Sequence, residues 1–349
     1  MSLYSIDHGA DGSKHFMKQL LRLGIGLVPF ALFFFIRPSF LLRYATPLYV
    51  LNALLLVLVL VMGSKGGGAQ RWINLGPIDF QPSEMSKLLT VITLSAFYAN
   101  RREDVNRLST FLLSILHVAI PLLLIFKQPH FGASLVILVA WLGVSIAAGL
   151  KARYIVGAVA VAGAMLGLAF LIPGVLKAYQ LERVHAMFGS MFGSSSDVKQ
   201  SENDERFQIL RAQMAVASGG VTGAGYLKGE FKLPGFVPEQ HTDFIFTVIG
   251  EEGGLVGCTL VLAGFGFFFY RIWRITHTAD DFFHRMISAG IFSVLAFHTI
   301  VNLGMNLELL PVVGLWLPFM SYGGTAIWLC LASVGLMLNL NRRARPILF

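Results

Sequence analysis

The residues best suited to act as a base or to bind a cation lie in one stretch, FVPEQHTDFIFTVIGEEGGLVG. Glu239, His241 and Asp243 directly precede a long apolar run, and Glu251 and Glu252 follow within it. In a continuous helix, at about 1.5 Å per residue, the last two acids would lie roughly 12 Å deeper than Asp243. Ionisable groups inside an apolar span are costly and indicate function. The structural alternative for Asp243 is an N-cap.

Glu251 and Glu252 are neighbours, so on a helix they point about 100° apart and cannot both face one cavity. One of them could pair with a base on a neighbouring helix. The other could lie at a helix interface beside the two glycines that follow. A structural ion pair and a direct role in chemistry therefore both stay open.

A second group of polar residues lies in GGGAQRWINLGPIDFQPSEMSK. Arg71 is a planar, bidentate donor for phosphate. Ser83 is predicted to cap a helix whose first turn contains Glu84, with Lys87 one turn further on the same face. Lys87 could form an ion pair with Glu84, or it could face a cavity and bind a pyrophosphate. The glycines do not form a P-loop, because no GxxxxGK(S/T) pattern follows a strand.

A third group lies in NLGMNLELLPVVGLWLPFMSYGG. Asn302 and Asn306 share one helix face, and two prolines then interrupt the chain before Ser321. This pattern predicts a re-entrant or interfacial turn that leads into the last helix. Such irregular backbone is tolerated at membrane depth only where it is buried in protein or lines a cavity. The helical residues His117 and His298 are predicted to form interhelical hydrogen bonds.

The composition predicts an all-α polytopic membrane protein. Of 349 residues, 55% are hydrophobic and 13% are charged, and about nine apolar runs are long enough to cross roughly 30 Å of hydrocarbon. Lipid-facing backbone must satisfy its own hydrogen bonds, so these spans are helical. Cys258 and Cys330 provide neither a disulfide framework nor metal-ligand spacing. The predicted spans are 19–36, 46–62, 83–100, 109–127, 131–150, 154–172, 242–270, 285–307 and 322–340.

Basic residues in the short loops fall on one side of the predicted membrane, which the positive-inside rule makes cytoplasmic. The net charge of +8 therefore implies no nucleic-acid partner. The loops 63–82 and 173–241 then lie outside, where their own bases indicate either an anionic ligand or a solvated surface. An odd number of spans puts the N-terminus outside, so we expect a further N-terminal span that this chain lacks. The cytoplasmic bases are Arg37, Arg43, Arg101, Arg102, Arg107, Lys151, Arg153, Arg271, Arg274, Arg285, Arg342, Arg343 and Arg345.

At four stretches the sequence resembles the SEDS family (shape, elongation, division and sporulation proteins), in its RodA branch. The resemblance implies one integral membrane domain over 1–349, with the family's ten-span fold lacking its first helix here and a large extracytoplasmic loop at 173–241. It implies a peptidoglycan glycosyltransferase that polymerises lipid II at the outer face of the bacterial cytoplasmic membrane during cell elongation and cell-shape maintenance. It also implies a class B penicillin-binding protein as transpeptidase partner. The matching stretches are GAQRWINLG..DFQPSEMSK (68–87), VASGGVTGAGYLKG (216–229), FVPEQHTDFIFTVIGEEGGLVG (236–257) and NLGM…LLPVVG..LPF.SYGGT (302–325).

The resemblance also implies roles for single residues. Asp243 matches the family's essential aspartate, while Arg71, Glu84 and Lys87 match polar residues that line its cavity. Three positions depart from the family pattern: His130 replaces an acid, Glu308 a glycine and Trp316 a proline.

In the expected reaction Asp243 is the general base for the acceptor hydroxyl, or it holds a divalent cation, Mg or Mn. No organic cofactor is expected. Arg71 and Lys87 would stabilise the leaving pyrophosphate. A flippase for the same lipid-linked precursor, with Glu251, Glu252 and Lys87 as its polar path, is one alternative; a non-catalytic scaffold is another. The other expected substrate contacts are Glu84, Glu239, His241, Lys228 and Ser321.

Overall fold

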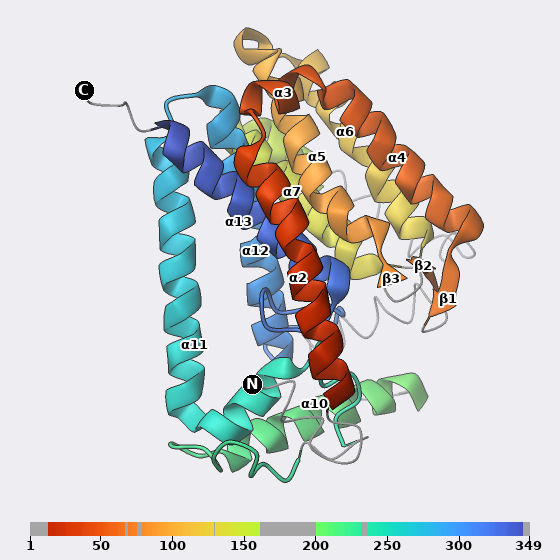
Figure 1. Ribbon diagram of the computed structural model, residues 1–349. Helices are drawn as coiled ribbons and strands as arrows, with labels where there is room; N and C mark the ends of the chain where they lie inside the picture. Colours follow the sequence, from red (N-terminus) through yellow and green to blue (C-terminus); the bar gives the residue numbers. More distant parts are fainter. Residues whose placement is uncertain are drawn as a thin grey trace.

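The computed structural model describes residues 13–66, 69–74, 79–128, 130–160, 200–231 and 236–344. Helices run side by side as a bundle (Figure 1). In this part of the chain, six helices are long and apolar enough to cross a membrane, which confirms the predicted polytopic all-α class. They are α2 (Ser13–Phe35), α4 (Ala45–Met62), α6 (Leu108–Lys127), α11 (Ile245–Thr278), α12 (Phe282–Asn306) and α13 (Gly324–Ala344).

Three further predicted spans correspond to helical segments of other kinds. α5 (Pro82–Ala99) is buried over nearly its whole length and includes polar residues, so it lies at the centre of the bundle. α7 (Phe131–Ala147) is apolar but only 17 residues long. Residues 152–160 are helical, and the rest of the predicted span at 154–172 lies outside the described residues, as does the first part of the predicted loop 173–241. The short helix α3 (Pro38–Arg43) joins α2 to α4.

Small residues let the helices approach closely, as is usual for membrane bundles. A Cβ atom on Gly335 of α13 would collide with the backbone oxygen of Phe30 on α2. At the end of the same pair, the Asn339 side chain donates to the carbonyls of Phe33 and Ile36, at 3.0 and 2.6 Å. The outer helix α2 is thereby fixed along α13.

The predicted loop 63–82 contains a small sheet. β1 (Ser64–Gly66), β2 (Ala69–Asn74) and β3 (Asp79–Phe80) pair antiparallel in the order β1-β2-β3. Trp72 and Ile73 favour extended backbone, because aromatic and β-branched side chains fit a pleated surface. This is the one departure from an all-helical chain within the described residues, and it positions Arg71.

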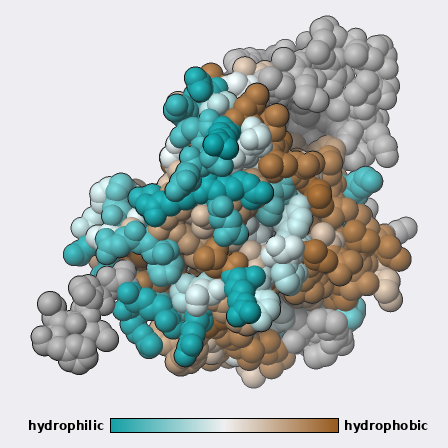
Figure 2. All heavy atoms as spheres, turned by 90° about the horizontal axis from the view of Figure 1, so that it is seen from above, coloured by the Kyte–Doolittle hydropathy of each residue, from teal (hydrophilic) through white to brown (hydrophobic). Residues whose placement is uncertain are grey.

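The basic loops gather at one end of the bundle, and α10 (Gln200–Ser218) lies at the other (Figure 1). Figure 2 looks onto the basic end, where hydrophilic side chains cover the helix ends and apolar side chains surround them. The loops α2–α4, α5–α6 and α11–α12 meet here, together with the end of α13. This arrangement agrees with the common side that the charge pattern predicts.

The prediction of one continuous helix over 242–270 is wrong. α11 begins at Ile245 and is broken at Gly254, where φ is +59° and ψ is −159°. Only glycine adopts this region readily. The part before the break turns aside and lies next to α10, whereas the part after it stands at the flank of the bundle (Figure 1).

The backbone groups freed by this break are bonded by the glycine-rich segment that follows α10. Glu251 and Glu252 therefore lie beside that segment and not 12 Å deeper inside a span. Their side chains accept backbone N–H groups, from Phe231 at 2.7 Å and from Leu227 at 3.1 Å. Both acids thus bind the outer segment itself. The backbone bonds run from Ala224 N to Glu251 O (2.9 Å), Gly225 N to Glu252 O (3.1 Å), Leu255 N to Gly220 O (3.0 Å) and Val256 N to Val221 O (3.1 Å).

Candidate active site

Asp243 lies in the turn that directly precedes α11. The N-cap of α11 is Phe244, and no side chain caps it, so the N-cap alternative for Asp243 is wrong. The carboxylate lies beside Gly314, where a Cβ atom would be 3.4 Å from Asp243 Oδ2. Gly314 has φ +71°, a conformation that suits glycine. The carboxyl group therefore lies at the start of an apolar helix without capping it.

The surroundings of Asp243 suit a base that works near neutral pH. Burial, and to a smaller extent the nearby Glu239 carboxylate, raise the pKa of Asp243 to about 6, against a hydrogen bond with Thr242 that lowers it. A general base is most effective when its pKa lies close to the working pH.

One face of α12 fixes the backbone of this turn. Asn302 Nδ2 donates to the carbonyl of Asp243 at 2.8 Å and to that of Leu315 at 2.7 Å. Asn306 Nδ2 donates to the same Asp243 carbonyl at 3.1 Å. The predicted common face of the two asparagines is confirmed. One turn earlier, His298 Nδ1 lies 3.3 Å from the carbonyl of Trp316.

The turn before α13 holds the other side of the Asp243 segment. Ser321 Oγ donates to the Thr242 carbonyl at 2.6 Å and accepts the Leu317 N–H at 2.7 Å. Tyr322 N donates to the His241 carbonyl at 2.8 Å, and the two rings meet edge to face with centroids 5.5 Å apart. Because the Ser321 hydroxyl is committed to backbone groups, its place favours a positioning role over substrate contact.

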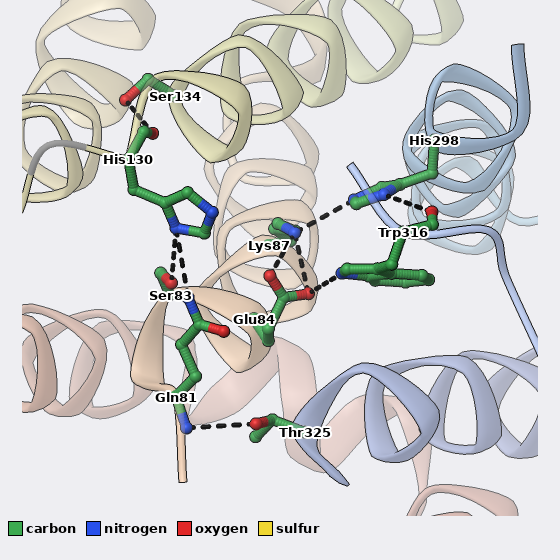
Figure 3. A network of polar contacts seen from close by, with 9 residues as sticks. All are labelled: Gln81, Ser83, Glu84, Lys87, His130, Ser134, His298, Trp316 and Thr325. Atoms are coloured by element: carbon green, nitrogen blue, oxygen red, sulfur yellow. Dashed lines mark hydrogen bonds and ion pairs between the residues drawn. The ribbon is translucent and has the colours of Figure 1, made fainter. Parts of the chain in front are cut away.

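Glu84 and Lys87 form the predicted i,i+3 ion pair, buried at the centre of the bundle (Figure 3). Lys87 Nζ donates to both carboxylate oxygens, at 2.7 and 2.8 Å, and to His298 Nε2 at 3.0 Å. Trp316 Nε1 donates to Glu84 Oε2 at 2.9 Å, and its ring stacks on that of His298. All three ammonium protons are therefore used, so a phosphate can bind Lys87 only by displacing one of these partners.

The predicted Ser83 cap is wrong, because the helix begins at Pro82 and its N-cap is Gln81. Proline is favoured at the first helical position, since its missing N–H would be unpaired there. Ser83 Oγ and Gln81 Nε2 each lie 3.3 Å from His130 Nδ1 (Figure 3). Gln81 N also donates to Thr325 Oγ1 at 3.1 Å. The start of α5 is thus bonded to both neighbouring helix starts.

The remaining predicted site residues lie on separate segments. Arg71 of β2 donates through Nε to the carbonyl of Gln128 at 3.0 Å, which ties the sheet to the end of α6. Lys228 is exposed in the glycine-rich segment after α10. Glu239 is exposed at φ +51° and accepts the Thr242 hydroxyl at 3.2 Å. Glu239 and His241 thus share a segment with Asp243, whereas Arg71 and Lys228 belong to other segments.

The three departures from the family pattern have visible consequences. Trp316 and His130 enter the polar network of Figure 3. Glu308 has φ +57°, the conformation that favours the glycine usual at this position. Its carboxylate accepts Gln213 Nε2 of α10 at 2.6 Å.

In the described part of the chain, no group of three or more His, Cys, Asp or Glu side chains could hold a metal ion. Asp243 and Glu239 are close enough to interact electrostatically. Magnesium is often bound through one or two carboxylates together with substrate phosphates. Asp243 and Glu239 are the acids available here for a site of that kind, in which the substrate supplies further ligands.

A known family matches nearly the whole chain. The profile of the FtsW/RodA/SpoVE family, described as "Cell cycle protein", matches residues 1–346. The chain belongs to this family. Its long apolar helices accordingly make it a multi-pass membrane member of the SEDS proteins.

Individual proteins of the family are similar to this SEDS protein over most of its length. It is 34% identical over 306 residues to the probable peptidoglycan glycosyltransferase FtsW of Geobacter sp. (strain M18), covering 87% of this chain and 80% of that protein. It is 32% identical over 324 residues to the peptidoglycan glycosyltransferase MrdB of Escherichia coli (strain K12), covering 93% and 85%.

Solved structures share the fold of this SEDS protein. A chain in a peptidoglycan synthase complex, reported for the structural coordination of polymerization and crosslinking, superposes with a TM-score of 0.77 at 30% identity, covering 97% of this chain and 93% of that one. The rod shape determining protein RodA of Thermus thermophilus gives 0.69 at 29% identity, covering 99% and 93%.

Sequence reasoning missed two residues of the site region. Gly314 lies against the Asp243 carboxylate, and only its place in a proline-rich turn marked it. Arg22 of α2 lies with its guanidinium 4.4 Å from the centre of the Tyr322 ring. A base near the outer end of a predicted span was the signal that could have found it.

Proposed function

We propose that this chain is a peptidoglycan glycosyltransferase that polymerises lipid II at the outer face of the bacterial cytoplasmic membrane, in cell elongation and shape maintenance. Membership of the SEDS family and the glycosyltransferase names of its relatives support the activity. The observation that best supports the location of the active site is the placement of Asp243. Its backbone is fixed by Asn302 and Asn306, while its carboxyl lies at the start of an apolar helix.

Asp243 would accept the proton of the acceptor 4-hydroxyl as that oxygen attacks C1 of the donor sugar. The new O4–C1 bond forms as the C1–O bond to the pyrophosphate breaks, and the pyrophosphate keeps the electron pair. Pyrophosphate is already a good leaving group, so one carboxylate base suffices. Direct displacement inverts the configuration at C1.

The leaving pyrophosphate needs positive charge nearby. Lys87 and Arg71 are our candidates, with the exchange at Lys87 requiring that His298 or Glu84 give up a hydrogen bond. A divalent cation, Mg or Mn, held by Asp243 and Glu239 would supply the same stabilisation when bound. No organic cofactor enters this scheme.

The polyprenyl tail has an apolar hollow available. It lies between α11 and the turn before α13, next to the segment that bonds Thr242. Such a position keeps the tail in the membrane while the sugars stay in water. Its lining residues are Val261, Gly264, Phe265, Phe268, Pro318, Phe319, Met320 and Val334.

A class B penicillin-binding protein is the proposed partner. The synthase complex that superposes on this chain concerns both polymerization and crosslinking. A polymerase of this family makes glycan strands, so crosslinking calls for a transpeptidase beside it.

The contacts of the acidic residues count against the flippase alternative. A transporter would place its polar path near the bilayer midplane. Glu251 and Glu252 instead bind backbone N–H groups of the outer segment.

The test is polymerisation of labelled lipid II by the purified full chain, with and without the partner, read as glycan strands on a gel. Asp243→Asn should abolish the strands, whereas Glu230→Gln, an exposed acid in the same outer region, should leave them unchanged. Normal strands from folded Asp243→Asn would overturn the mechanism. Absence of strands from wild type, together with transfer of lipid II across vesicle membranes, would favour the flippase.

A further inference from the structure

Arg22 is a charged side chain near the outer end of α2. It lies six positions into the apolar span Phe16–Phe35, about 9 Å along the helix axis. The N-terminal half of α2 lies at the same end of the bundle as α10, away from the basic loops (Figure 1). Charge sorting does not place a base here, and a charge inside a span is costly. Arg22 therefore requires a reason of its own.

The guanidinium lies beside the turn before α13. Its carbon is 4.4 Å from the centre of the Tyr322 ring. A Cβ atom on Gly324 would lie 3.3 Å from Arg22 Nε, a tight contact, so the glycine at that position leaves room for the close approach. The backbone of Arg22 is fixed as well, because Trp328 Nε1 donates to the Arg22 carbonyl at 2.8 Å.

The guanidinium has donors left over. Nη1 is shut off from solvent and has no hydrogen-bond partner, and no acid pairs with Arg22 anywhere in the described ranges. The ring of Tyr322 stabilises the cation, but Nη1 is left without a hydrogen-bond acceptor. A planar guanidinium with free N–H groups is the side chain best suited to bind two phosphate oxygens.

Tyr322 connects this base to the Asp243 segment. The Tyr322 ring meets the His241 ring at 5.5 Å, and its backbone N–H binds the His241 carbonyl. A lipid-linked sugar keeps its tail in the membrane and its sugars in water, so its phosphates lie at the depth of the head groups. Arg22 lies at the outer end of a span, one aromatic ring away from the segment that contains the base.

We infer that Arg22 binds the diphosphate of a polyprenyl-linked sugar donor. Arg22 would then fix the donor from the α2 side while Asp243 activates the acceptor from the α11 side. The inference rests on the proposed function for the identity of the lipid. In the simpler interpretation Arg22 only supports Tyr322. The two interpretations predict different effects of an Arg22 substitution on diphosphate binding.

The test uses the purified full chain in nanodiscs and undecaprenyl pyrophosphate as the probe, with undecaprenol as the uncharged comparison. Arg22→Gln should weaken binding of the pyrophosphate about tenfold or more, as expected for a lost charge-assisted contact, and change undecaprenol binding little. Lys18→Gln removes the same charge one turn away, from an exposed position on the same helix, and should stay within about twofold of wild type. Arg22→Lys should recover part of the loss.

In the polymerisation assay, Arg22→Gln should raise KM for lipid II more than it lowers kcat. Equal pyrophosphate binding by Arg22→Gln and wild type would overturn the inference. So would an equal loss from Lys18→Gln, or an equal loss of undecaprenol binding, which would indicate a disturbed turn. If wild type binds the pyrophosphate through Arg22 but makes no glycan, the proposed function fails and the diphosphate site stands.

Discussion

Asn302 on α12 donates a 2.8 Å hydrogen bond to the backbone carbonyl of Asp243, from 59 positions further along the chain. The bond holds the backbone of the candidate base and leaves its carboxyl group unbound to that helix. The same amide also holds Leu315, on the segment that carries Gly314 past the carboxylate. The Asn302 side chain therefore fixes both the Asp243 turn and the neighbouring segment that contains Gly314.

Substitution of Asn302 should show how far catalysis depends on the position of Asp243, because it leaves the Asp243 carboxyl group itself unchanged. Asn302→Ala leaves two buried carbonyls without this donor, so we expect unfolding to become easier by about 1–3 kcal/mol and kcat to fall by about tenfold. Asn306→Ala should have a smaller effect on kcat, because Asn302 still binds the Asp243 carbonyl. Thermal unfolding and strand synthesis measure the two effects. A normal kcat for Asn302→Ala would show that this placement is unimportant.

The polymerisation rate should depend on the protonation of Asp243. Its raised pKa, about 6, predicts that kcat/KM increases with pH through about 6 and then levels off. Glu239→Gln removes the neighbouring negative charge and should shift this rise to lower pH. An unchanged pH profile in Glu239→Gln would contradict the electrostatic coupling of the two acids.

The same pKa makes a prediction for stability. Because the folded state holds the Asp243 proton more tightly than the unfolded chain does, the group's stabilising contribution is present below pH 4 and is lost as pH rises through about 6. Asp243→Asn should therefore raise the melting temperature at pH 7.5 and change it little at pH 4. A lower melting temperature for Asp243→Asn at pH 7.5 would refute this sign.

The buried pair of Glu84 and Lys87 should show strong non-additivity. Removing either partner leaves an uncompensated buried charge, so Glu84→Gln and Lys87→Met should each destabilise by about 3–5 kcal/mol. The double variant should be more stable than the sum of the two losses predicts. Thermal unfolding in one detergent provides the comparison, and strict additivity would mean that the pair is not coupled.

The break in α11 should tolerate no side chain. At Gly254 a Cβ atom would run into the backbone of Gly223 and Val221, and φ is positive. Gly254→Ala is expected to cost at least about 1–3 kcal/mol from backbone strain alone. Gly264→Ala, in the regular part of the same helix with open space around it, should be neutral or stabilising. Equal melting temperatures for the two variants would mean that the chain is not broken at Gly254.

Local periodicity made much of this structure predictable. The common face of Asn302 and Asn306 and the i,i+3 pair of Glu84 and Lys87 follow from helical spacing, which needs only neighbouring residues. His298 was predicted as an interhelical contact, and it is one. That it accepts a hydrogen bond from Lys87, 211 positions away, could not be predicted from any local pattern.

The break at Gly254 escaped prediction for a related reason. An isolated glycine in an apolar run is compatible with a continuous helix. What stabilises the break is hydrogen bonding to Gly220, Val221, Ala224 and Gly225, about thirty residues earlier. The sheet β1–β3 escaped because its strands are very short and lie in a segment rich in glycine.

The break also divides α11 into two parts that contact different neighbours. The segment Ile245–Gly253 is bonded to the outer segment after α10, and Asp243, just before it, is bonded to α12. The remainder of α11 stands at the flank of the bundle. In the most apolar 18-residue stretch of the helix only 6% of the residues are buried inside the protein. A force applied to that span from the lipid side would therefore reach the outer surface through Gly254 and the four backbone bonds that flank it, at Glu251, Glu252, Leu255 and Val256. The turn of Asp243 would keep its place, since its anchors lie on α12 and in the turn before α13.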